Sequence, residues 1–111
     1  MRYYELVVVY KPTLTEQEQK EKLNALQEFL KSNGAEIIKL TEWGRRELAY
    51  PIQKFTTAYY YIINYKTDNS ELPPKLEYNL RIDEDIIRFL NFKIHPKKLE
   101  KKEENLEQVE A

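Results

Sequence analysis

Two apolar runs, residues 3–10 and 56–65, constrain the fold of this chain more than any other feature of its sequence. Both are rich in Val, Ile and Tyr, and in both the apolar side chains fall on the two faces of an extended strand. A strand that is apolar on both faces must be covered on both. Each run is therefore predicted to be a central strand of a sheet.

A helix is predicted over residues 15–33, between the first strand and a second one. Thr15 and Glu18 have the three-residue spacing of a capping box. Leu and Phe then recur at helical intervals until Gly34, which is the residue type that most often ends a helix. Residues 35–48 are predicted to form the second strand of the sheet.

The second half of the chain repeats the order strand, helix, strand. Ser70 is a candidate cap for a second helix, which carries buried leucines and tolerates Pro73 and Pro74 in its first turn. Residues 85–94 are predicted as the last strand, and Pro96 stops it.

The predicted order βαββαβ favours an α+β, ferredoxin-like sandwich. Its four-stranded antiparallel sheet has the order 4-1-3-2, because right-handed crossovers then place the two-faced apolar strands in the middle. Both helices cover one face of this sheet, and the other face is expected to be bare. Residues 1–96 are predicted as the folded domain. Residues 97–111, almost wholly Lys, Glu and Gln, are predicted as a disordered tail that becomes helical on contact with a partner.

Charge and composition exclude several classes of function. The formal net charge is −1, and residues 1–95 contain 14 basic and 14 acidic side chains, which argues against broad attraction to nucleic acid but leaves room for a local basic patch. The chain has no Cys, and no apolar run approaches the roughly 20 residues that span a bilayer. We expect a soluble, intracellular protein without a membrane segment, a metal or another cofactor.

No set of residues in the sequence is typical of an active site. The single histidine, His95, precedes a proline at the end of a strand, and we expect it to have a structural or solvated role rather than a catalytic one. Asp83, Glu84 and Asp85 are expected to point in different directions from a solvated turn rather than to hold a metal. Two glycines cannot build a phosphate-binding loop. We therefore expect neither an enzyme nor a small-molecule substrate.

Residues 43–52 contain the strongest binding signal in the chain. Arg45 and Arg46 stand side by side near Trp43, and each guanidinium matches phosphate oxygens and base edges. Gly44 can adopt backbone angles closed to other residues, so a bulge is predicted that aims the arginines. The strand is expected to end near a turn at Tyr50 and Pro51, which pack the edge of the core.

Other basic and aromatic side chains are weaker candidates. Arg2, Lys54, Arg88 and Lys93, taken singly, are each more often solvated surface charges than ligand contacts. In the third strand, Tyr59 and Tyr61 alternate as base-stacking aromatics do in the RNA-recognition motif, although the basic residue and glycine of that motif are missing. A stacking platform and packing within the protein both remain open for these tyrosines.

The segment from Trp43 to Ile52 resembles the signature of the bacterial-type small-subunit ribosomal protein six family. The opening residues 1–5, the apolar strand before Pro12 and Gly34-Ala35 are also similar to that family. The resemblance extends to about residue 95 and includes the closing pattern Leu80-Arg81-Ile82-Asp83, Ile86, Arg88 and Lys93.

The resemblance implies a cytoplasmic, structural component of the small ribosomal subunit. It implies binding to the central domain of 16S ribosomal RNA, as a heterodimer with small-subunit ribosomal protein eighteen. The RNA-facing positions that it implies are Arg2, Arg45, Arg46, Lys54, Arg88 and Lys93. The alternative is a ferredoxin-like interaction module that self-associates or binds a protein partner, by strand addition for example, without RNA.

Overall fold

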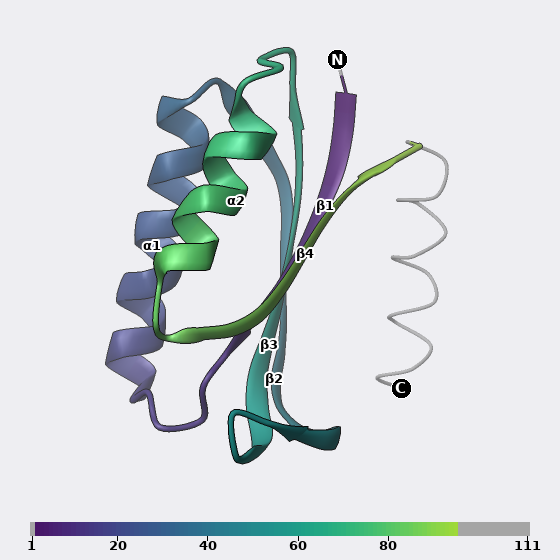
Figure 1. Ribbon diagram of the computed structural model, residues 1–111. Coiled ribbons are helices and arrows are strands. Elements are labelled where there is room, and N and C mark those ends of the chain that lie inside the picture. Colours follow the sequence, from purple (N-terminus) through teal and green to yellow (C-terminus); the bar gives the residue numbers. More distant parts are fainter. Residues whose placement is uncertain (1, 96–111) are drawn as a thin grey trace.

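The computed structural model describes residues 2–95, which form a four-stranded antiparallel sheet with two helices on one face (Figure 1). The elements are β1 (Arg2–Tyr10), α1 (Glu16–Ser32), β2 (Ala35–Ile52), β3 (Phe55–Thr67), α2 (Leu72–Ile82) and β4 (Ile86–Ile94). The sheet order is β2-β3-β1-β4, which is the predicted order read from the opposite edge. The ferredoxin-like prediction is therefore confirmed. The predicted tail, residues 97–111, lies outside the described residues.

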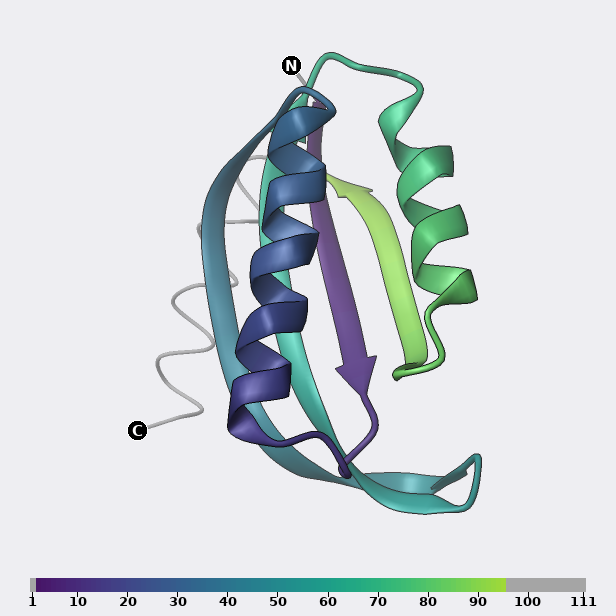
Figure 2. The same ribbon diagram turned by 90° about the vertical axis from the view of Figure 1, so that its left-hand side faces the viewer.

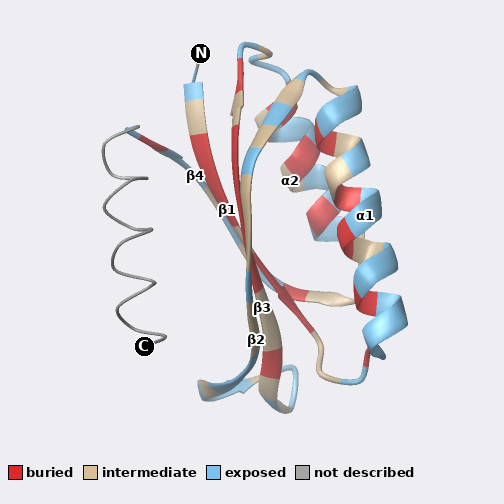
Figure 3. Cartoon of the chain, turned by 180° about the vertical axis from the view of Figure 1, so that it is seen from behind, coloured by how far each residue is buried: buried red, intermediate tan, exposed pale blue. Residues whose placement is uncertain are grey.

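The core lies between the helices and the two central strands, β1 and β3. These strands pair antiparallel along the whole length of β1, from Arg2 opposite Thr67 to Tyr10 opposite Tyr59. Every second side chain points to the helices, and Figure 3 shows the buried strip running along both strands and the inner sides of α1 and α2. Full burial of one large apolar side chain contributes roughly 1.5–3 kcal/mol. The central pair therefore carries much of the burial that stabilises the fold.

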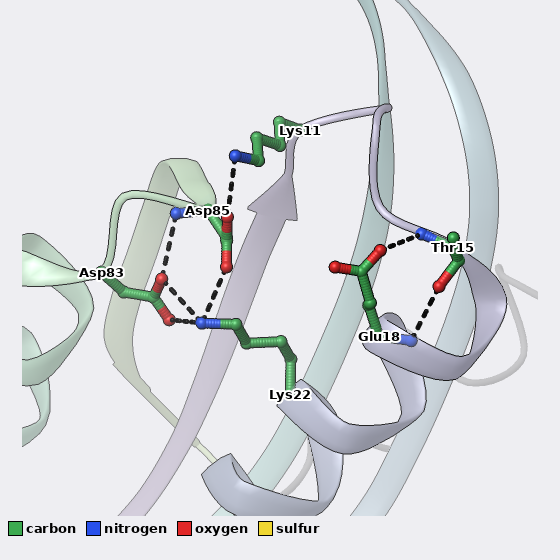
Figure 4. A network of polar contacts seen from close by, with 6 residues as sticks. All are labelled: Lys11, Thr15, Glu18, Lys22, Asp83 and Asp85. Atoms are coloured by element: carbon green, nitrogen blue, oxygen red, sulfur yellow. Dashed lines mark hydrogen bonds and ion pairs between the residues drawn. The ribbon is translucent and has the colours of Figure 1, made fainter.

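The start of α1 is the capping box that the sequence predicts. The backbone N–H of Glu18 donates to Oγ1 of Thr15 over 3.1 Å, and the backbone N–H of Thr15 donates to Oε1 of Glu18 over 3.0 Å (Figure 4). At the other end, Gly34 follows the cap residue Asn33 with a φ of 87°. This left-handed conformation explains why glycine stands there.

The second helix is capped differently from the prediction. Glu71 is the N-cap residue of α2 and makes no side-chain capping bond, so the prediction of Ser70 as the cap is wrong. Asn69 organises the connection instead: its Oδ1 accepts from the backbone N–H of Glu71 over 3.0 Å, and its Nδ2 donates to the carbonyl of Asn33 over 2.8 Å. This side chain joins the start of α2 to the end of α1.

The second strand is longer than predicted, since β2 continues through Pro51 to Ile52. Proline is tolerated because β2 is an edge strand and one of its sides needs no ladder partner. The register with β3 shifts between Glu47 and Ile52, so residues 48–51 lie outside the regular ladder. This irregular end of the hairpin bends towards the side of the sheet away from the helices (Figure 1). Figure 2 shows the same end crossing below the sheet towards the β4 side.

The face opposite the helices is called here the open face. The sequence predicted it to be bare, and that prediction is wrong. At its hairpin end, a second small cluster forms around Val9, Ala58 and Ile87. Leu48, Ile52 and Phe55 from the bent hairpin pack against this cluster. The hairpin therefore covers one end of the open face.

Replacing the cap of α1 tests the local contribution of the capping box. We expect Thr15→Ala to lower the free energy of unfolding by about 1 kcal/mol, because the N–H of Glu18 loses its acceptor. Urea denaturation followed by circular dichroism measures the change. Thr13→Ala, in the exposed turn before the helix, is the matched control. An equal loss in both variants would contradict a specific capping effect.

Candidate nucleic-acid interface

The bulge predicted at Gly44 is present in β2. The register with β3 shifts between Glu42 and Gly44, and Gly44 has a φ of 74°. A Cβ at this position would meet no atom within 4 Å, so the backbone angle and not the available space requires glycine. The bulge lies directly before the two arginines and sets which face of the sheet each of them takes.

Arg45 and Arg46 point to opposite faces of the sheet. Arg45 lies opposite Tyr59, which packs against the core under the helices, and its Nη2 donates to Oγ1 of Thr57 over 3.3 Å. Arg46 lies opposite Ala58 in the cluster of the open face. Since successive residues of a strand alternate, two arginines that are neighbours in sequence cannot grip one ligand from the same face.

The open face carries an aromatic stack that the sequence did not indicate. The rings of Trp43 and Tyr60 stack with centroids 6.1 Å apart and planes 29° apart, and Cζ of Arg46 lies 5.8 Å from the centre of the Trp43 ring. The stacking platform considered for Tyr59 and Tyr61 is wrong. Both side chains point towards the helices, where the hydroxyl of Tyr61 donates to Gln19.

The alternation of side chains along β3 could have shown that Tyr60 lies on the open face. Its companions on the same face are Ala58, Ile62 and Asn64, and Asn64 is the one amide among the apolar residues of the run. A polar member marks the less covered face of a strand. The tyrosines on the opposite face of the strand, Tyr59, Tyr61 and Tyr65, pack in the core under the helices.

Arg88 lies on the open face, opposite Val9. Its Nη1 donates to the hydroxyl of Tyr50 over 2.8 Å, which links β4 to the bent end of the hairpin. Tyr50 is 57% exposed, so the expectation that it packs the edge of the core is wrong. The side chain instead holds the guanidinium of Arg88.

The other predicted site residues are dispersed. Lys54 is exposed at the tip of the hairpin, where its φ is 71°. Arg2, opposite Thr67, and Lys93, opposite Tyr4, are exposed near the other end of the sheet and on the side of the helices. The structure therefore places Arg46 and Arg88 on the same open face, on its two opposite edge strands, with Lys54 on the adjoining hairpin, and puts Arg2 and Lys93 on the other side.

A comparison with protein families identifies the chain. The model of the family described as ribosomal protein S6 matches residues 3–93, nearly all of the described part. The chain belongs to the ribosomal protein S6 family. It is therefore a structural protein of the small ribosomal subunit in the cytoplasm and not an enzyme.

Curated relatives and a solved structure agree with this assignment. Small ribosomal subunit protein bS6 of Aquifex aeolicus is 50% identical over 101 residues, which are 91% of this chain and 92% of that protein. The bS6 protein of Nitratiruptor is 49% identical over 98 residues, which are 88% of this chain and 76% of that protein. The crystal structure of 30S ribosomal protein S6 from Thermotoga maritima superposes with a TM-score of 0.81 at 29% identity, covering 96% and 97% of the two chains.

The acidic cluster of this S6-family chain is an ion-pair network. Nζ of Lys22, on α1, lies 3.0 Å from Oδ1 of Asp83 and 2.9 Å from Oδ2 of Asp85, and Nζ of Lys11 lies 2.9 Å from Oδ1 of Asp85 (Figure 4). The expectation that these carboxylates point in different directions is thus wrong for Asp83 and Asp85. Within residues 2–95 no group of three potential metal ligands occurs, and no helix is long and apolar enough to cross a membrane.

The lysines change the titration of this network. Hydrogen bonds from Lys11 and then Lys22 hold the pKa of Asp85 below its ordinary value of 3.8, although partial burial acts in the opposite direction. Partial burial works against the charged form of Lys22, but hydrogen bonds to Asp85 and Asp83 outweigh it and raise the pKa of Lys22. The network ties the start of β4 to α1 and to the end of β1.

Removing the Asp85 charge tests the network. A carboxyl whose pKa is lower in the folded state stabilises the protein above its ordinary pKa and loses that contribution as the pH falls through its folded pKa. We expect Asp85→Asn to lower the free energy of unfolding modestly at neutral pH, and the difference from the unmutated chain to shrink as the pH falls below the ordinary carboxyl pKa of 3.8 and through the lower folded pKa of Asp85. Urea denaturation across this pH range measures it. Glu84→Gln is the control, and an equal pH dependence in that variant would contradict the assignment to Asp85.

Proposed function

We propose that this S6-family chain binds the central domain of 16S ribosomal RNA together with small-subunit ribosomal protein eighteen. Residues 1–96 are the proposed binding domain, and residues 97–111 are proposed as a separate charged tail. One observation carries the RNA part of the proposal. Arg46 and Arg88 share the open face, and neither forms an ion pair with a carboxylate within residues 2–95.

The balance of charges supports a partner-assisted mode of binding. The 14 basic and 14 acidic side chains of residues 1–95 give no excess positive field to attract RNA from a distance. A basic partner protein would supply that field, and this chain would add a few local contacts. Asp83 and Asp85 are already paired with lysines, so their charges add little repulsion against the RNA phosphates.

The proposed contacts are to phosphates and to RNA shape. Arginine donates two parallel hydrogen bonds to phosphate oxygens, and such contacts position a protein on RNA without reading its sequence. Arg46, Arg88 and Lys54 form the proposed principal group, since they lie on the open face and its adjoining hairpin. Arg45, Arg2 and Lys93 are proposed as further contacts, which would require RNA to reach the other side of the sheet.

Two double variants test the open face as the RNA-contacting face. Each phosphate contact adds roughly 0.7–0.9 to the slope of log affinity against log salt concentration. We expect Arg46→Ala with Arg88→Ala to reduce this slope by about 1.4–1.8, because two contacts are lost. Arg45→Ala with Arg46→Ala should reduce the slope by less than this, because Arg45 points to the other face and is proposed only as a secondary contact.

The measurement is a gel-shift titration of central-domain RNA with the full chain and small-subunit protein eighteen at several salt concentrations. Thermal unfolding of each variant must stay close to that of the unmutated chain, since these arginines are exposed. Arg2→Ala with Lys93→Ala is the matched control for removing two charges. A larger loss of slope in that control would contradict the assignment to the open face.

The alternative is a protein-interaction module that works without RNA. Leu90 and Phe92, on the edge strand β4, are 51% and 38% exposed, and exposed apolar side chains on an edge suit a protein partner. Light scattering of the chain alone, combined with the same RNA titration, separates the two. Tight self-association together with no RNA binding in the presence of small-subunit protein eighteen would favour the alternative.

A further inference from the structure

We propose that the open face of this chain contains a stacking site for one unpaired RNA base, formed by Tyr60, Leu90 and Arg88 and supported by Trp43 and Arg46. The inference rests on the proposed RNA-binding function and extends it, because it names a group that is bound in addition to phosphates. It follows from the row of side chains that crosses the sheet at this level.

The row crosses all four strands at a single register. Gly44 in the bulge of β2 lies opposite Tyr60 in β3, Tyr60 lies opposite Val9 in β1, and Val9 lies opposite Arg88 in β4. Trp43 from the bulge stacks on the Tyr60 ring, and Arg46, two residues along β2 from Gly44 and opposite Ala58, places its Cζ 5.8 Å from the centre of the Trp43 ring. Arg88 thus lies at the β4 end of the row and Arg46 near its β2 end, and the rings of Trp43 and Tyr60 lie between them.

A hollow of about 230 Å³ interrupts this row next to Tyr60. Its lining comes from Val7, Val9, Tyr60, Arg88, Phe89 and Leu90. One water takes up roughly 30 Å³ of liquid, so the hollow has room for a ring system but not for a helix. Val9 is 2% exposed and Leu90 is 51% exposed, so the hollow has a buried floor and an accessible rim.

The side chains around the hollow match a nucleotide in their chemistry. The lining is apolar except for Arg88 and the hydroxyl of Tyr60, which suits the face of a base and offers few groups that could read its edge. Arg88 donates to the hydroxyl of Tyr50. Within residues 2–95 neither Arg88 nor Arg46 has a carboxylate partner, so the two guanidiniums, near the two ends of the row, suit the phosphates on either side of a base. An acidic protein segment would satisfy the charges but would leave the aromatic row without a stacking partner.

Trp43 has a supporting role in this arrangement. It covers part of the Tyr60 ring on the β2 side, while the hollow adjoins the same tyrosine from the side of β1 and β4. The stack therefore holds Tyr60 in place without filling the hollow. Because Trp43 is the only tryptophan in the chain, its fluorescence reports directly on this site.

The test compares intact and abasic RNA strands. The probes are a single-stranded oligoadenylate of about ten nucleotides and the same backbone without its bases, so the phosphates are equal and only stacking differs. Each is titrated against the full chain and small-subunit protein eighteen, while Trp43 fluorescence is followed. We expect the intact strand to bind roughly 5- to 100-fold more tightly than the abasic one and to change the fluorescence.

Tyr60→Leu should remove this preference, so that both strands bind with the affinity of the abasic one. Tyr3→Leu is the matched control, because Tyr3 is a half-buried tyrosine on the open face of β1 but far along the strand, opposite Ile94. It should keep the preference. Thermal unfolding must confirm that both variants are folded.

Three outcomes would overturn the stacking site. Equal binding of both strands by the unmutated chain, or a preference that survives Tyr60→Leu, would exclude stacking there while leaving the phosphate contacts of the proposed function intact. A Tyr60-dependent fluorescence change on adding small-subunit protein eighteen without RNA would assign the hollow to a protein side chain. Loss of all RNA binding in the unmutated complex would instead reject the proposed function itself.

Discussion

The antiparallel pairing of β1 with β3 is the constraint on which the rest of the structure depends. Both strands are apolar on both faces, so the chain must bring cover to each side of one pair. The helices do this on one side, where Tyr4 and Tyr65 stack with centroids 5.3 Å apart beneath them. On the other side the bent end of the β2–β3 hairpin packs on Val9 and Ala58. What this hairpin leaves accessible is the proposed RNA-contacting surface.

The distribution of charge follows from this arrangement. Asp83 and Asp85 lie where α2 gives way to β4, and Lys22 and Lys11 neutralise them there. Arg46 and Arg88 lie on the open face and meet an indole ring and a phenol hydroxyl instead of carboxylates. A chain with no net charge over its first 95 residues can thus still present a local cationic surface. Because this cationic surface is small and the net charge of residues 1–95 is zero, the proposed RNA binding needs a basic partner protein.

Much of the fold could be predicted, because its signals are local. The capping box at Thr15, the bulge at Gly44 and the order of the strands each depend on a few neighbouring residues or on periodicity. The two wrong predictions about the elements, the cap of α2 and the end of β2, also had local causes. Asn69 took the organising role expected of Ser70, and an edge position let β2 run through Pro51. The candidate site was harder to predict, because it depends on which face each strand residue takes.

The sequence by itself determined the elements, the central strands, the family resemblance and the chemical character of the arginines. Only the tertiary structure decided which of these side chains meet. One step along a strand turns a side chain to the other face, which separated Arg45 from Arg46, and the register set by the Gly44 bulge decided which face each of them took. The same alternation buried Tyr59 and Tyr61 and left Tyr60 beside Trp43 on the open face, while the sheet order brought Arg88 into the same row. Spacing in the sequence cannot show this, because the row joins residues from four strands through backbone hydrogen bonds.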